Sequence, residues 1–194
     1  MRLAAFLALA APVFAEEADG VALFRTACLA GGGVEALEGT GLDVEPSEAI
    51  PPRLSPLRAD GLMVLRAEGP GVTFHLAMPG EDGTDAAFVP ALCAAEIADR
   101  SAGELRRAFG GHIASGAYLG SSGEADLWAL PGALLLQIGC APAGASVSLI
   151  APEGYYDTEA TGRAANLRRG LEGALANPAP PPDPTDLACR EDVA

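Results

Sequence analysis

The stretch that decides the fold runs from Gly61 to Phe109: GLMVLRAEGPGVTFHLAMPGEDGTDAAFVPALCAAEIADRSAGELRRAF. Its first two apolar runs, 61–66 and 72–78, flank a Pro-Gly pair, which favours a chain reversal. A third run, 92–97, alternates so that every second residue shares one face, as the residues of a strand do. The spacing predicts three consecutive strands, of which the first two form a hairpin.

A helix is predicted directly after the third run. Ser101 and Glu104 have the spacing of a capping box, in which the serine side chain accepts from the Glu104 amide and the glutamate reaches back. Apolar residues follow at helical spacing, and Gly110-Gly111 is expected to end the helix with positive φ. The whole stretch predicts a β-β-β-α unit, with a helix over 86–98 as the alternative to the third strand, because Ala and Glu favour helices.

The same order of elements returns in the second half of the chain. Three strand-like runs, 123–130, 133–140 and 146–150, precede a helix expected from about 159 to 176. This order suggests a degenerate duplication with half-repeats 61–113 and 123–176, and the alternative is chance similarity in a chain rich in Ala, Leu and Arg. The predicted fold class is α+β, with a mainly antiparallel sheet of about six strands and helices packed on one face.

The remaining segments are arranged around one domain. Residues 1–15 have the features of a cleaved signal peptide, 16–177 are expected to form a single domain, and 178–194 form a Pro-rich tail. An N-terminal helix is predicted over about 20–30, where three glycines end it. The Pro-rich segment 42–59 is expected to run irregularly over the surface, because proline lacks the amide hydrogen that a helix or sheet needs.

The N-terminal segment predicts export. Arg2 precedes an apolar run over 3–14, and Val-Phe-Ala at 13–15 has the form of a cleavage site. The run is shorter than the roughly 20 residues of a membrane-spanning helix, so no span is expected after cleavage. Every basic side chain other than histidine is Arg, and Ala, Gly and Pro are abundant, which favours a GC-rich bacterial genome. We therefore expect a periplasmic or secreted protein of a Gram-negative bacterium.

The charged residues exclude several kinds of partner and cofactor. The formal net charge is −14, so nucleic acid and acidic lipid headgroups are not expected to bind. An acidic surface keeps an exported protein soluble, and it also suits a cationic protein partner. Because the chain has no lysine, it lacks a Walker A loop and the amine that pyridoxal or Schiff-base chemistry needs. No cofactor is predicted.

The four cysteines, Cys28, Cys93, Cys140 and Cys189, predict two disulfides, because their number is even and the expected compartment is oxidising. Three pairings exist in principle. We favour Cys28–Cys93, which ties the first helix to the third strand, and Cys140–Cys189, which ties the tail to the domain. A metal site is the alternative, but the chain has no Cys-x-x-Cys motif and its two histidines are isolated. No metal site is predicted.

No catalytic set stands out along the chain. His112, Ser115 and Asp126 supply the residue types of a hydrolytic triad, but closeness in sequence says nothing of their geometry. His75 lies within a predicted strand between two apolar residues, and it is expected to face solvent or a hydrogen-bonded edge. The sequence therefore predicts no catalytic residue.

Two function classes stay open. The first, which we favour, is a non-enzymatic binding or inhibitor-type protein that contacts another protein or an envelope component. Tyr155 and Tyr156 are its predicted recognition surface, because aromatic side chains anchor interfaces. The second is a small periplasmic hydrolase whose site is assembled from distant segments. A pocket that brings His75 or His112 within reach of a carboxylate would favour the enzyme, and a face without such a pocket would favour binding.

Overall fold

The computed structural model describes residues 19–59, 61–79, 91–155, 161–183 and 187–189. The predicted signal peptide and Tyr156 lie outside these residues. Helices combine with one antiparallel eight-stranded sheet in an α+β fold. The strands are β1 (Asp43–Pro46), β2 (Leu62–Gly69), β3 (Val72–Pro79), β4 (Leu92–Ala98), β5 (Ala117–Ser122), β6 (Ala125–Leu130), β7 (Leu134–Ala141) and β8 (Gly144–Ile150). Within the described ranges, no helix has the length and apolar character to cross a membrane.

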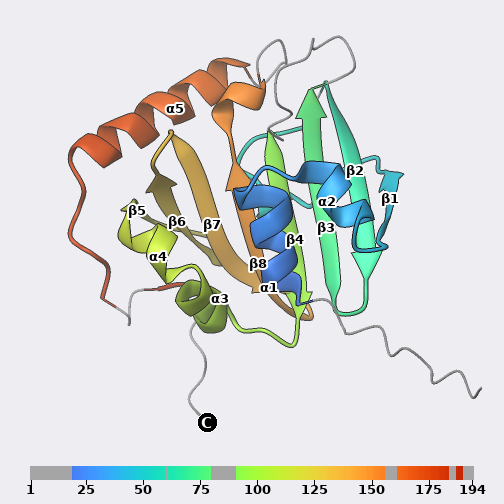
Figure 1. Cartoon of the computed structure of the whole chain (residues 1–194). Coiled ribbons are helices and arrows are strands. Elements are labelled where there is room, and N and C mark those ends of the chain that lie inside the picture. The colour runs from blue at the N-terminus through green and yellow to red at the C-terminus, as the bar shows by residue number, and fades with distance from the viewer. Residues whose placement is uncertain (1–18, 60, 80–90, 156–160, 184–186, 190–194) are drawn as a thin grey trace, which may run out of the picture.

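The strand order is β1-β2-β3-β4-β8-β7-β6-β5, so the chain builds two meanders of four strands each (Figure 1). The meanders meet along the antiparallel pair β4–β8, where Cys93 lies opposite Leu149 and Ala95 lies opposite Val147. Every other pairing in the sheet joins strands that follow each other along the chain. The pairing at the centre of the sheet, β4 with β8, is therefore the one that joins strands distant along the chain.

The prediction of about six strands was wrong because it omitted the two edge strands. The strand β1 lies inside the segment predicted to be an irregular connector, and it carries Asp43, Glu45 and Pro46. The strand β5 contains a register shift between Tyr118 and Gly120, and most of its residues are exposed or half-buried. An edge strand tolerates proline and charge and pairs on one side only, so its sequence carries little of the apolar alternation that predicts a strand.

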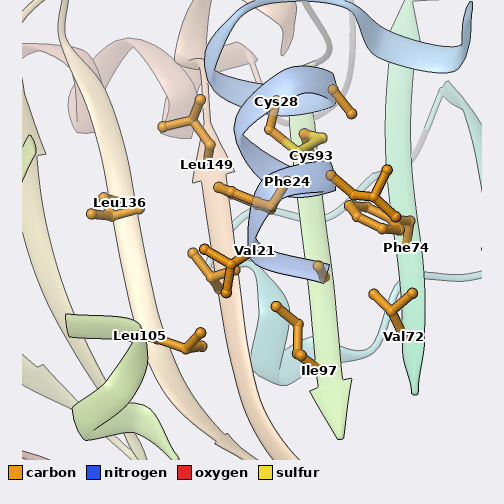
Figure 2. Close-up of a cluster of buried hydrophobic side chains, with 14 of the residues drawn as sticks. Val21, Phe24, Cys28, Val72, Phe74, Cys93, Ile97, Leu105, Leu136 and Leu149 are labelled. Carbon is orange, nitrogen blue, oxygen red and sulfur yellow. A yellow bond between two sulfur atoms is a disulfide. The ribbon is translucent and has the colours of Figure 1, made fainter. Parts of the chain in front are cut away.

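One face of the sheet, here called the first face, carries Phe74, Cys93, Leu136 and Val147 and holds the larger apolar core. Two helical segments lie over it in front of β4 (Figures 1 and 2): α1 (Gly20–Phe24) and the π-helical turn η1 (Arg25–Leu29). Phe24 of α1 is fully buried. It meets the ring of Phe109 edge to face, with 5.4 Å between the ring centroids. The predicted N-terminal helix is confirmed, and its last turn is wider than an α-helix.

Three more short helices precede β5 along the chain: α2 (Gly33–Glu38), α3 (Ala102–Ala108) and α4 (Gly110–Ala114). The predicted capping box of α3 is confirmed, because Ser101 Oγ accepts from the Glu104 amide at 3.2 Å and the Glu104 carboxylate accepts from the Ser101 amide at 2.8 Å. These hydrogen bonds lower the pKa of Glu104. Gly110-Gly111 does not end the helix with positive φ: α3 ends at Ala108, Phe109 leaves helical geometry with φ −97° and ψ 12°, and Gly110 begins α4.

The opposite face, here called the second face, is covered by α5 (Thr161–Ala176) and by the connector 47–59. The helix α5 packs on β5, β6 and β7, with Ala164 and Leu171 buried. The connector crosses this face through the 3-10 turn η2 (Pro52–Leu54), where Leu54 is fully buried. The prediction that helices lie on one face was therefore wrong. The central strands carry apolar residues on both faces, so both faces need a cover.

The two disulfides link Cys28 with Cys93 and Cys140 with Cys189, which is the pairing favoured from the sequence. The first joins η1 to β4 within the core. The second joins β7 to the C-terminal tail, which Asp126 also holds, because its fully buried carboxylate accepts from the Ala188 amide at 2.9 Å. One disulfide therefore braces the core, and the other fastens the tail.

The predicted strands of the two half-repeats, β2–β4 and β6–β8, take equivalent places in the mirrored strand order. The helices that close the two half-repeats do not match: α3 packs on the first face, and α5 packs on the second face. The internal duplication stays a prediction.

Candidate functional site

Polar side chains form a row across the middle of the second face. The strand register aligns His75 of β3, Ala94 of β4, Ser148 of β8 and Gln137 of β7. His75 is 5% exposed, Ser148 is 1% exposed and Gln137 is 6% exposed. Burial of polar groups costs free energy unless they are hydrogen-bonded, so a row of them in the centre of a sheet is a candidate site.

The connector reaches this row through Arg53 of η2. The Arg53 carbonyl accepts a hydrogen bond from the Gln137 side chain, and the Arg53 guanidinium pairs with Glu96, its Nε donating at 2.8 Å. The other carboxylate oxygen of Glu96 lies 3.7 Å from Nε2 of His75, which is too far for a hydrogen bond. Among the described residues, the ring nitrogens of His75 and the Ser148 hydroxyl have no hydrogen-bond partner. The sheet thus brings His75 beside a carboxylate.

Burial lowers the pKa of His75 below its ordinary value of 6.5, so its imidazole is neutral at neutral pH. The negative charge of Glu96 acts in the opposite direction, while the positive charges of Arg66 and Arg53 lower the pKa further. A neutral imidazole can act as a base, but catalysis also needs access to a substrate or a nucleophile. His75 is almost completely covered, which limits that access.

Arg53 and Glu96 border a shallow groove of about 280 Å³ at the ends of β3, β4 and β8. Small residues line much of it, among them Ala98 and Gly144. Gly144 is required there by its neighbours, since a Cβ atom at this position would come within 2.3 Å of the Ile97 carbonyl oxygen. A molecule in this groove would meet the Arg53–Glu96 ion pair, with His75 behind it.

A second cavity, here called the apolar cleft, opens on the first face beside the Cys28–Cys93 disulfide and has a volume of about 390 Å³. Leu29 of η1, Leu134 of β7 and Leu149 of β8 form much of its lining. Figure 2 shows Leu149 between the disulfide and Leu136. Ligand pockets in proteins measure roughly 300–1,000 Å³ and are lined mainly by apolar groups, so this cleft has the size and lining of a binding site.

Backbone features shape the rim of the apolar cleft. The chain leaves η1 through Gly31, whose φ is 74°, and a second rim segment turns at Gly132, whose φ is 85°. The third segment is the 3-10 turn η3 (Pro152–Tyr155), which lies so close to the sheet that a Cβ atom on Gly154 would come within 2.5 Å of Ala91. π-helical turns such as η1 are frequent at functional sites. The cleft is therefore a preformed feature of the folded chain.

The structure separates most of the residues that the sequence offered for function. Tyr155 is fully buried, and burial raises its pKa, so it cannot form part of an exposed recognition surface. That prediction was wrong for Tyr155, because η3 turns its ring into the core of the second face, and Tyr156 lies outside the described residues. His112 is exposed, and Ser115 donates to the backbone carbonyl of His112 rather than to its ring.

Asp126 does not join His112 and Ser115 in a catalytic set. Its carboxylate accepts hydrogen bonds from Arg106 at 2.9 Å and from Ser121 at 2.7 Å, besides the Ala188 amide. The expectation for His75 was also wrong, since the connector covers the face that it occupies. Across the parts of the chain that the structure describes, no three His, Cys, Asp or Glu side chains gather as metal ligands.

Sequence reasoning missed both the Arg53–Glu96 pair and the apolar cleft. Arg53 and Glu96 lie 43 positions apart, and no local pattern joins them. A signal for the second face was present at Gln137, which interrupts the apolar run of β7. The apolar cleft had no such signal, because leucines at a rim and leucines in a core look alike in a sequence.

Comparison of the chain with models of protein families, with curated proteins and with solved structures finds no match.

Proposed function

We propose that this chain is an exported binding protein and that its binding site is the apolar cleft beside the Cys28–Cys93 disulfide. Export to the periplasm of a Gram-negative bacterium is inferred from the signal-peptide features of residues 1–15. The two disulfides fit this compartment, because disulfides persist in oxidising surroundings. The partner is a protein or a component of the cell envelope.

The observation that carries the proposal is the preformed apolar cleft of about 390 Å³. Apolar surface that stays in contact with water costs free energy, and concave apolar surface on a folded protein marks a place where another molecule binds. Leu149 and Cys93 of its lining also belong to the main core, and the disulfide fixes the wall that Cys28 provides. A partner therefore meets a rigid site and loses little free energy in ordering it.

The test compares two tryptophan substitutions at exposed alanines of the same helical segment. Ala30 lies at the rim of the apolar cleft, so Ala30→Trp places a large ring at its mouth, whereas Ala22 lies outside the cleft and Ala22→Trp serves as the control. We expect the oxidised mature chain to capture a partner from periplasmic extract, Ala22→Trp to capture the same partner, and Ala30→Trp to lose it.

Circular dichroism and thiol titration confirm that both variants fold and keep their disulfides. Equal capture by Ala30→Trp and the unmodified chain would show that the apolar cleft is not the binding site.

A second candidate function is a small hydrolase, which the position of the Glu96 carboxylate in the groove favours. Its substrate would enter the groove at the Arg53–Glu96 pair, and Glu96 would supply the base, because it lines the groove and His75 does not. Chromogenic ester, phosphate and glycoside substrates test this candidate. Turnover that Glu96→Gln abolishes and Ala30→Trp leaves intact would establish it in place of the binding function.

A further inference from the structure

The rim of the apolar cleft carries a local excess of negative charge. Glu153 of η3 lines the cleft and is exposed. It pairs with Arg168 of α5 at 2.5 Å, and Arg168 also donates to Glu172 at 2.9 Å. Arg168 and Glu172 belong to α5 and do not line the cleft, so Glu153 is the one charged side chain among the described residues of the lining.

The rest of the molecule reinforces this sign. The formal net charge of the chain is −14, so its long-range electrostatic field attracts cationic partners and repels anionic ones. The carboxylate of Glu153 adds a local attraction at the cleft. Glu153 is placed to accept hydrogen bonds from a partner, and an arginine is the donor that suits a carboxylate best.

The size and lining of the apolar cleft determine which uncharged side chain of a partner fits it. A volume of about 390 Å³ is far more than one water molecule occupies, and its leucine lining offers nothing to hydrogen-bond. A large apolar side chain fills such a space and extends the core with which Leu149 is continuous. Aromatic anchors in a pocket with arginine beside them are the usual centre of a protein interface.

We propose that the apolar cleft binds a basic segment of another protein, which inserts one aromatic or large aliphatic side chain into the cleft and places an arginine against Glu153. This proposal rests on the binding function of the cleft and adds the chemistry of the partner. Glu153 selects the charge of the segment, and the leucine lining selects its anchor.

Three capped pentapeptides test the proposal by nuclear magnetic resonance titration of the isotope-labelled, oxidised mature chain. The first is Gly-Arg-Phe-Arg-Gly, the second replaces both arginines by glutamates, and the third replaces the phenylalanine by glycine. We expect the first peptide to shift the amide signals of Leu29, Gly31 and Gly154, which line the cleft, and to bind more tightly than the other two. The difference between the first and second peptides should shrink as salt is added.

Substitution of Glu153 distinguishes the effect of this one charge on peptide binding from the effect of the net charge of the chain. Glu153→Gln should weaken the arginine peptide about threefold, as expected for an exposed ion pair, and should not weaken the glutamate peptide. Glu38→Gln removes one charge from an exposed position at the end of α2 and away from the cleft, so it should have little effect.

Each remaining outcome has a distinct meaning. If the glutamate peptide shifts the same cleft signals as strongly as the arginine peptide, or if Glu153→Gln changes nothing, the charge selection is wrong while the binding function of the cleft stands. If no peptide shifts any cleft signal, the basic-segment proposal is overturned, and the capture comparison of Ala30→Trp with Ala22→Trp decides the binding function separately.

Discussion

The two faces of the sheet differ in what covers them and in what lies beneath the cover. On the first face, the central strands present apolar side chains such as Phe74, Val147 and Leu136, and the α1–η1 segment above them is joined to β4 by a disulfide. On the second face, the same strands present His75, Ser148 and Gln137 beneath a connector that is held by the pairing of Arg53 with Glu96.

The difference indicates that the first face contributes more to stability and that the second face rearranges more easily. Apolar burial and a covalent link concentrate free energy on the first face, and that face also carries the rigid apolar cleft. The second face has an apolar core too, but its connector is held by hydrogen bonds and a partly exposed ion pair instead of a disulfide, and such contacts contribute less. Substitutions on the two faces should therefore differ in size and in their response to pH.

The largest effect is expected when the first-face disulfide is removed. Cys28→Ala with Cys93→Ala opens a loop of 65 residues and should lower the free energy of unfolding by about 4 kcal/mol in the chain-entropy model. Cys140→Ala with Cys189→Ala should cost below roughly 1 kcal/mol, because the tail can detach without unfolding the sheet. Urea unfolding of both double variants measures the difference, and equal losses would show that the tail is part of the cooperative core.

A smaller effect should separate two neighbouring leucines of β7. Leu136 faces the first core and Leu135 faces the second, and both are almost completely buried. Leu136→Ala should cost about 3 kcal/mol and Leu135→Ala about 2 kcal/mol, because α5 and the connector can close over a cavity more easily than a helix held by a disulfide. Thermal and urea unfolding give both values. A greater loss of stability for Leu135→Ala than for Leu136→Ala would show that the second face is the more rigid one.

The smallest effect should be a pH dependence that belongs to the second face. Burial lowers the pKa of His75, so below its ordinary value of 6.5 the unfolded chain binds a proton that the folded chain does not. The stability that His75 contributes is complete above that pH and is lost as the pH falls toward the lowered pKa. Glu96 opposes the shift, and Arg53 and Arg66 support it.

Urea unfolding between about pH 5 and pH 8 measures this dependence. The free energy of unfolding of the unmodified chain should fall more steeply on acidification than that of His75→Asn. His112→Asn is the matched control, because His112 is exposed, and it should leave the steep dependence in place. Parallel curves for the unmodified chain and His75→Asn would mean that the folded chain accepts the proton on His75 readily.

Much of the fold follows from local sequence signals. The central strands, the capping box at Ser101 and the apolar stripe of α5 each have a pattern that a few neighbouring residues create. The edge strands β1 and β5 have no such pattern, because a strand paired on one side needs few apolar residues. The face that α5 covers was also not predictable, since an apolar stripe fits either face of a sheet that is apolar on both.

The candidate sites were harder to predict than the fold. The cysteine pairing could be inferred because each bridge had a structural reason, namely a helix tied to a strand and a tail tied to a domain. His75 was assigned to the correct strand but to the wrong environment, because its burial depends on where the connector crosses the sheet. The apolar cleft arises where η1 and β4 meet the consecutive elements β7, β8 and η3, from which η1 is distant along the chain.

The mirrored strand order has a consequence for assembly of the molecule. Since all pairings except β4–β8 join sequential strands, each meander can form from local contacts, and the loop-closure cost of a distant pairing falls on one seam. Cutting the chain at Ser115, between α4 and β5, would leave both meanders whole. Two separately produced fragments should then recognise each other along the unsatisfied edges of β4 and β8 and rebuild the sheet as a two-chain complex.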